Sequence, residues 1–128
     1  MPITEPSRVS VVSDSSPRSL DWYRRATLVV LPTRELEGFG LSTAEALACG
    51  AAVVGTPAGA TPELLRSLDP DLITEDVSAR SISATVVKLL AAPERLAQIR
   101  ERAAQRVVPS MAWDRVADAY VDLYERLA

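Results

Sequence analysis

The chain is predicted to be an α/β domain with a mainly parallel sheet, about four strands and helices on both faces. Four short apolar or β-branched segments alternate with helical segments along its 128 residues. Such alternation is typical of parallel sheets joined by right-handed helical crossovers. A chain of this length can bury one hydrophobic core but not two. We therefore expect a single domain over residues 1–128, with a helical tail over about 78–128.

The strands are predicted from short runs of branched apolar residues. Thr27–Leu31 is the clearest, since it is almost wholly apolar, as expected for a strand covered on both faces. Arg8–Val12 and Ala51–Gly55 are also short and β-branched or apolar. Asp71–Thr74 is the weakest of the four.

The helices are predicted from capping residues and from three- and four-residue apolar spacing. Leu41–Cys49 is rich in Ala, Leu and Glu, and Gly50 follows it as a terminating glycine. The spacing predicts one buried face for each tail helix. A helix is expected to start at Ser16-Pro17 and end near Ala26, and a short one to start at Thr61-Pro62 and end near Leu68. The three tail helices are expected to start at Ser78, Pro93 and Ser110.

Composition excludes several classes of function. The net charge is −3 and no basic run is present, which disfavours nucleic-acid binding. No apolar run is long enough to span a membrane, and Met1–Pro6 lacks a signal-peptide layout, so we expect a cytoplasmic protein. With no His and Cys49 as the single Cys, a Cys/His zinc site and a Ser-His or Cys-His pair are excluded within this chain.

The segment after the Thr27–Leu31 strand carries the strongest functional signal. Ligands of parallel α/β sheets bind at the carboxyl ends of the strands, near helix starts. Gly38 and Gly40 bracket Phe39 and allow a sharp turn close to a ligand. The backbone N–H groups of the residues that follow, Gly40, Leu41, Ser42 and Thr43, would point outward at the helix start. They form a predicted anion site suited to phosphate.

Two carboxylates, Glu37 and Glu45, flank this predicted anion site. They suit a ligand with hydroxyls on both sides of a diphosphate, such as a nucleotide sugar. Simpler interpretations remain open: Glu45 as a favourable acid near a helix start, Glu37 as a solvated loop acid, and both glycines as turn residues.

The two glutamates belong to a longer motif, which comprises Leu31-Pro32-Thr33, Glu37-Gly38-Phe39-Gly40-Leu41, Glu45-Ala46-Leu47-Ala48-Cys49-Gly50, Val53-Val54-Gly55-Thr56, Gly59 and Thr61-Pro62-Glu63. This motif resembles the donor-site signature of retaining GT-B glycosyltransferases, family 4, of the glycosyl transferases group 1 type. The resemblance extends from about Arg8 to the C-terminus and implies a partial Rossmann-like three-layer sandwich.

The resemblance also implies roles for individual residues. Glu37 would contact sugar hydroxyls as the catalytic candidate, and Glu45 would contact the ribose. The amides from Gly38 to Thr43 would hold the diphosphate and sugar, and Val11–Ser13 would lie against the base. No metal or other cofactor is implied. The acceptor would react on the face from which the diphosphate leaves, so that the sugar is transferred with retention.

The chain also departs from the family pattern. The N-terminal acceptor domain, the first two strand–helix units of the donor domain and their Arg/Lys pair have no counterpart, and Lys88 lies in a late helix. Ala60 stands where a second glycine is usual. We therefore expect a donor-binding part that is inactive alone. The Thr27–Leu31 strand could be left as an apolar edge, which predicts a homodimer or a partner chain supplying the acceptor domain.

Two other functions are weighed against this one. The first is a non-catalytic nucleotide-binding or protein-interaction module derived from the same fold. The second is a receiver-type signalling domain, which needs a Lys at a late strand end and is disfavoured because Lys88 lies in a helix. Trp113, Tyr120 and Tyr124 are expected to serve packing.

Overall fold

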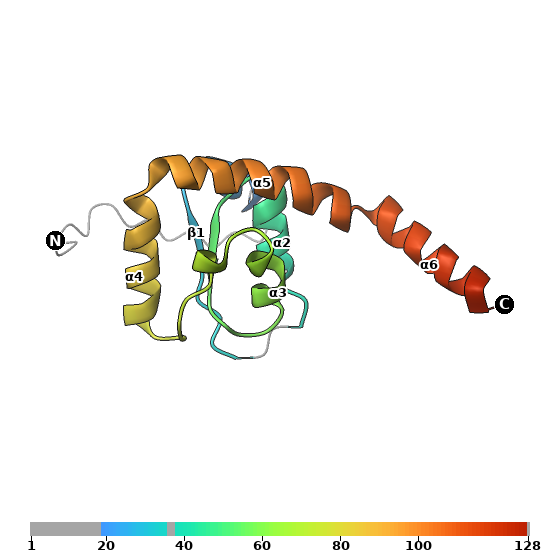
Figure 1. Cartoon of the computed structure of the whole chain (residues 1–128), viewed down its shortest axis with the longest axis horizontal. Helices are drawn as coiled ribbons and strands as arrows, with labels where there is room; N and C mark the ends of the chain where they lie inside the picture. Colours follow the sequence, from blue (N-terminus) through green and yellow to red (C-terminus); the bar gives the residue numbers. More distant parts are fainter. Residues whose placement is uncertain (1–18, 36–37, 128) are drawn as a thin grey trace.

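The computed structural model describes residues 19–35 and 38–127 and has the predicted mixed α/β architecture (Figure 1). Strands and helices alternate in the first half of the described chain, and three consecutive helices follow. In order, the elements are α1 (Ser19–Arg25), β1 (Val29–Leu31), α2 (Leu41–Ala48), β2 (Val53–Gly55), α3 (Thr61–Arg66), the 3-10 helix η2 (Pro70–Leu72), α4 (Ala79–Leu90), α5 (Pro93–Met111) and α6 (Trp113–Leu127).

The two described strands, β1 and β2, pair in parallel. Val29 lies opposite Val53, and Leu31 lies opposite Gly55. Parallel neighbours need a crossover, which α2 provides here. Figure 1 shows α4 on one side of the strands and α2 on the other, and both helices contact β2. The predicted parallel pairing with helices on both faces is therefore confirmed for the part of the sheet that the structure describes.

The predicted strand Asp71–Thr74 is wrong. Its first residues belong to η2, because Pro70 favours a turn and the Asp69 carboxylate accepts a hydrogen bond from the Asp71 amide at 3.0 Å. Only Ile73 makes a parallel bridge, to Gly55. The predicted strand Arg8–Val12 lies outside the described residues.

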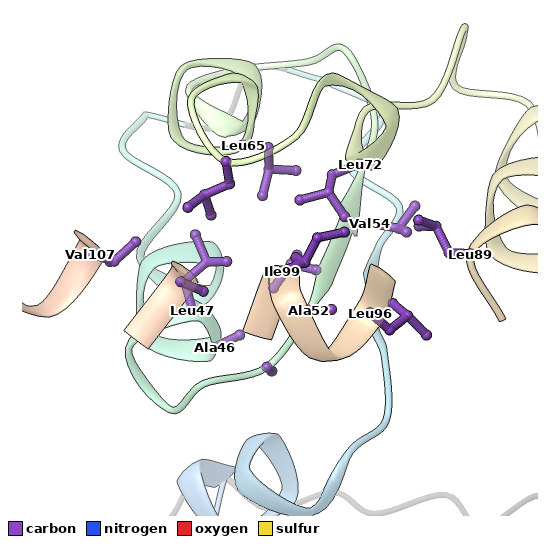
Figure 2. Close-up of a cluster of buried hydrophobic side chains, with 14 residues drawn as sticks. Ala46, Leu47, Ala52, Val54, Leu65, Leu72, Leu89, Leu96, Ile99 and Val107 are labelled. Atoms are coloured by element: carbon purple, nitrogen blue, oxygen red, sulfur yellow. The ribbon is translucent and has the colours of Figure 1, made fainter. Parts of the chain in front are cut away.

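The hydrophobic core collects buried side chains from β2 and from five helical segments (Figure 2). Leu47 of α2, Leu65 of α3, Leu72 of η2, Leu89 of α4 and Ile99 of α5 are all fully buried. Each such side chain contributes about 1.5–3 kcal/mol relative to leaving it in water. The helix α5 runs across the other elements (Figure 1), so that one face of it closes this core.

Two arginines of α5 bind the carboxyl ends of shorter helices. Arg100 Nε donates to the carbonyl oxygen of Gly50 at 3.0 Å, just beyond α2. Arg106 donates to the carbonyl oxygen of Ser67 at 2.9 Å, at the end of α3. A cation at the end of a helix satisfies free carbonyls and complements the helix dipole. Gly50 has a φ of 75°, as predicted for a terminating glycine.

An ion-pair cluster joins η2 to α4 and α5. The guanidinium of Arg95 contacts the buried carboxylate of Asp69 at 2.8 and 3.0 Å, and also lies 2.8 Å from Asp71. Lys88 Nζ donates to Asp71 at 2.8 Å. The hydrogen bonds from Lys88 and then Arg95 lower the pKa of Asp71 below its ordinary value of 3.8. The cluster therefore stabilises the fold most when Asp71 is ionised.

The predicted buried face of the last helix is wrong. No residue of α6 is buried, and Trp113 and Tyr124 are 86% and 65% exposed. Figure 1 shows α6 extending away from the other elements, after a break at Ala112, whose backbone is extended. The apolar residues of α6 do have helical spacing, but no other element of the described chain covers the face that they form. Within residues 19–35 and 38–127, no helix is both long and apolar enough to cross a bilayer.

We predict that Arg95→Met lowers the melting temperature at pH 7, because it removes a partner of Asp71 and the hydrogen-bonded guanidinium of the buried Asp69, whose other cation, Arg102, lies 3.9 Å away. The folded-state pKa of Asp71 is depressed, so its stabilising contribution is present above pH 3.8 and is lost as the pH falls through the folded-state value. The melting-temperature difference between wild type and variant should therefore shrink between pH 5 and pH 2, which thermal scans monitored by circular dichroism would measure.

Arg80→Met, at an exposed position in the same helix as Lys88, is the control and should show little difference at any pH. A difference for Arg95→Met that stays constant down to pH 2 would contradict the contribution of Asp71.

Candidate functional site

Two loops meet at the carboxyl edge of the β1–β2 pair. The first follows β1 and leads to α2, and the second comprises residues 56–60 and leads to α3. Since the strands are parallel, both loops and both helix starts lie at the same edge. This is the edge where the sequence predicts the ligand site.

The start of α2 presents backbone N–H groups that take no part in the hydrogen bonds of the helix. Gly40 is its N-cap residue, with φ 77° and ψ 43°, a left-handed conformation that favours glycine. No described side chain caps this helix. The bond from the Ala44 amide to the Gly40 carbonyl, at 3.0 Å, is the first of the helix. The amides of Leu41, Ser42 and Thr43 therefore precede the helical hydrogen-bond ladder, which is the arrangement that binds anions.

The predicted site residues differ in exposure. Gly38 is exposed, Phe39 and Leu41 are 59% and 63% exposed, and Ser42 is half-buried. The side chain of Thr43 is fully buried, so that only its backbone is suited to meet a ligand. Glu37 lies outside the described residues, and its predicted position beside the anion site stays a prediction.

Glu45 is exposed on the second turn of α2. Its side chain lines a shallow depression of about 280 Å³ between α2 and the end of α5. A larger apolar depression of about 560 Å³ lies nearby, lined by Phe39, Leu41, Ala44, Ser110, Met111, Trp113 and Val116. In the described part of the chain, no three His, Cys, Asp or Glu side chains come together as a metal site would require. The structure thus places Glu45 on the helix that carries the free amides.

The sequence did not predict the contacts that three buried threonines and a tightly packed glycine make at this edge. The hydroxyls of Thr43 and Thr61, both fully buried, lie 3.4 Å apart. Thr56, directly after β2, donates its hydroxyl to the carbonyl oxygen of Thr33. A Cβ added to Gly55 would lie 2.2 Å from Thr61 Cγ2, so α3 packs directly onto the strand backbone. The signal for them was a polar β-branched residue beside each strand end or helix start.

A parallel sheet with an uncapped helix start at its carboxyl edge is the arrangement found in many nucleotide-binding α/β domains. The sequence profile described as "Glycosyl transferases group 1" matches residues 8–106. The chain belongs to this family of glycosyltransferases. The resemblance seen in the donor-site motif is therefore confirmed.

The relatives that the chain matches are considerably longer than the chain itself. It is 33% identical over 108 residues to D-inositol 3-phosphate glycosyltransferase 1 of Catenulispora acidiphila, covering 84% of the chain and 25% of that protein. It is 34% identical over 106 residues to the lipopolysaccharide core biosynthesis mannosyltransferase LpcC of Rhizobium leguminosarum bv. viciae, covering 83% and 30%. The chain thus spans about a quarter to a third of the length of these relatives.

A solved structure agrees with the sequence comparison. Sucrose-phosphate synthase from Thermosynechococcus elongatus superposes with a TM-score of 0.69 at 27% sequence identity, covering 83% of this chain and 26% of that one. The predicted fold class is confirmed: the chain has the fold of the C-terminal part of a GT-B glycosyltransferase.

We predict that Gly55→Ala destabilises the domain by about 1–3 kcal/mol, as other overpacking substitutions do. The new methyl group would lie 2.2 Å from Thr61 Cγ2 and 3.0 Å from Leu65 Cδ1, so α3 must shift. Urea unfolding would measure the change. Gly38→Ala is the matched control, because a Cβ there meets nothing within 4 Å, and its effect should stay within about 0.5 kcal/mol. Equal stability of Gly55→Ala and wild type would contradict this close packing.

Proposed function

We propose that this chain binds the donor of a glycosyltransferase, a nucleotide-diphosphate sugar, and serves transfer of its hexose to an acceptor with retention. The uncapped start of α2 behind Gly40 is the observation that carries the proposal, since it offers amides for a diphosphate. A mannosyltransferase among the relatives supports a hexose as the transferred group. We further propose a cytoplasmic location.

Each end of the donor has a candidate partner. The amides from Gly38 to Thr43 would bind the diphosphate and part of the sugar, Glu45 would accept hydrogen bonds from the ribose, and Glu37 would accept them from the sugar. Backbone amides and the positive end of α2 would offset the diphosphate charge in place of a metal. The exposure of Glu45 leaves its carboxylate accessible to such a ligand.

The reaction asks for little covalent chemistry from the chain, which contains no His. In the proposed step the acceptor hydroxyl attacks the anomeric carbon on the face from which the diphosphate leaves. The bond between the anomeric carbon and the phosphate oxygen breaks as the glycosidic bond forms, and the acceptor proton passes to the departing phosphate. Preorganised amides at α2 would stabilise the charge that develops on this phosphate.

We propose that the chain is inactive alone and that another polypeptide segment or chain supplies the acceptor domain. Its short span relative to the relatives supports this, as does the exposed apolar stripe of α6, formed by Trp113, Tyr120, Leu123 and Leu127. On β1, the apolar Val30 is also 37% exposed. A second copy of the chain is the other candidate partner. If no nucleotide binds, a non-catalytic interaction module becomes the better description.

We predict saturable binding of one nucleoside diphosphate and its sugar conjugate when UDP, GDP and ADP and their glucose or mannose conjugates are titrated by calorimetry. Glu45→Ala should raise the dissociation constant for nucleotide and conjugate by about tenfold or more, the loss expected for a hydrogen bond to a charged group. Glu37→Ala should weaken binding of the sugar conjugate but not binding of the free nucleoside diphosphate. Glu101→Ala, an exposed glutamate of α5, is the control. Absence of binding at millimolar ligand would refute the donor site.

We predict that the chain self-associates at micromolar concentration or binds a separately expressed acceptor domain, as sedimentation velocity would report. Trp113→Ser and Leu127→Ser should weaken the complex, because they remove apolar side chains that are exposed on α6. Asp118→Ser, at an exposed polar position of the same helix, should not. A monodisperse monomer that does not bind the acceptor domain would rule out both a second copy of the chain and the acceptor domain as partners.

A further inference from the structure

Buried threonine hydroxyls tie together the two loops at the carboxyl edge of the sheet. Thr56, directly after β2, donates to the carbonyl oxygen of Thr33 in the loop that follows β1. Thr43, in the first turn of α2, shares a hydrogen bond with Thr61, the first residue of α3. These residues are 23 and 18 positions apart in the chain, so both contacts are tertiary rather than local.

Each of these hydroxyls is buried and has a hydrogen-bond partner. Thr43, Thr56 and Thr61 are each at most 1% exposed. A buried hydroxyl without a partner is costly, and no buried side-chain nitrogen or oxygen of the described residues lacks one. Because the partners lie on different loops and helices, satisfying each hydroxyl requires one relative placement of these segments.

The contacts continue to the turn that opens α2. A Cβ added at Gly40 would lie 3.7 Å from Thr43 Oγ1 and 3.5 Å from Leu64 Cδ1 of α3. On its other side, Thr61 packs its methyl group against the Gly55 backbone. An unbroken series of contacts thus connects the end of β2, through α3, to Gly40 and the free amides of α2.

We propose that Thr43, Thr61 and Thr56 are positioning residues that hold the amides of α2 in place for the donor diphosphate. This inference rests on the proposed function. Amides bind a developing or full charge best when they are fixed before the ligand arrives, and displacements of about 0.5 Å matter. Packing alone does not require the hydroxyls, since valine has nearly the same shape as threonine.

The test compares Thr56→Val and the double variant Thr43→Val/Thr61→Val with Thr56→Ser, which keeps its hydroxyl. Replacing both members of the Thr43–Thr61 pair leaves no orphaned polar group, so the double variant should fold with a melting temperature near that of wild type. Thr74→Val is the matched control, because Thr74 donates a similar bond to the Asp76 carbonyl on the other side of β2 from β1.

We expect Thr56→Val and the double variant to raise the calorimetric dissociation constant for the bound nucleoside diphosphate about fivefold or more, the change equivalent to one neutral hydrogen bond. Thr56→Ser should restore binding to within about twofold, and Thr74→Val should leave it unchanged. Binding within twofold of wild type in both valine variants, or an equal loss in Thr74→Val, would overturn the inference.

The position of the α2 amides can also be measured in the free protein, without ligand. In ¹H–¹⁵N spectra of the free protein, both valine variants should shift the amide signals of residues 38–44, whereas Thr74→Val should not. If wild type bound no nucleotide, the proposed function would fail while these shifts still supported the positioning contacts. Unchanged amide signals in that segment would overturn the positioning itself.

Discussion

The packing of α5 across the other elements is the constraint on which the rest of the fold depends. Its buried residues close the core over α2, α3, η2 and β2, and they follow one face of the helix: Leu96, Ile99, Ala103 and Val107. Arg100 and Arg106 of the same helix bind carbonyls at the ends of α2 and α3. One helix therefore supplies both the apolar cover and the polar partners that fix two shorter helices, which are too short to be stable in isolation.

This arrangement makes α2 chemically asymmetric. Beyond its carboxyl end Arg100 binds the Gly50 carbonyl, whereas its amino end begins at Gly40 without a side-chain cap. Free carbonyls are thus satisfied within the fold, and free amides are left at the carboxyl edge of the sheet. Arg100 therefore helps to fix the carboxyl end of α2, and the contact between Thr43 and Thr61 fixes its amino end relative to α3.

The same helix also ends the compact part of the molecule. Near the end of α5, Met111 still packs against the core, and the extended Ala112 then redirects the chain into α6. The apolar stripe of α6 has the spacing of a packed helix but no surface of the described chain to pack on. A chain that spans about a quarter of the length of a matched relative thus has its own hydrophobic core together with an exposed apolar stripe on α6.

The sequence alone determined the fold class, the two parallel strands within the predicted runs Thr27–Leu31 and Ala51–Gly55, the starts of α2 and α4, and the family, because apolar period, capping residues and the Gly-Phe-Gly motif are local signals. Tertiary structure decided the rest. Asp71–Thr74 became a turn because Asp69 and Pro70 act there, and α6 stayed uncovered because burial depends on a neighbouring surface that spacing cannot reveal. The pairing of Thr43 with Thr61 arises only when segments 18 positions apart meet, and the fit of Thr61 against Gly55 depends on how α3 packs back onto β2.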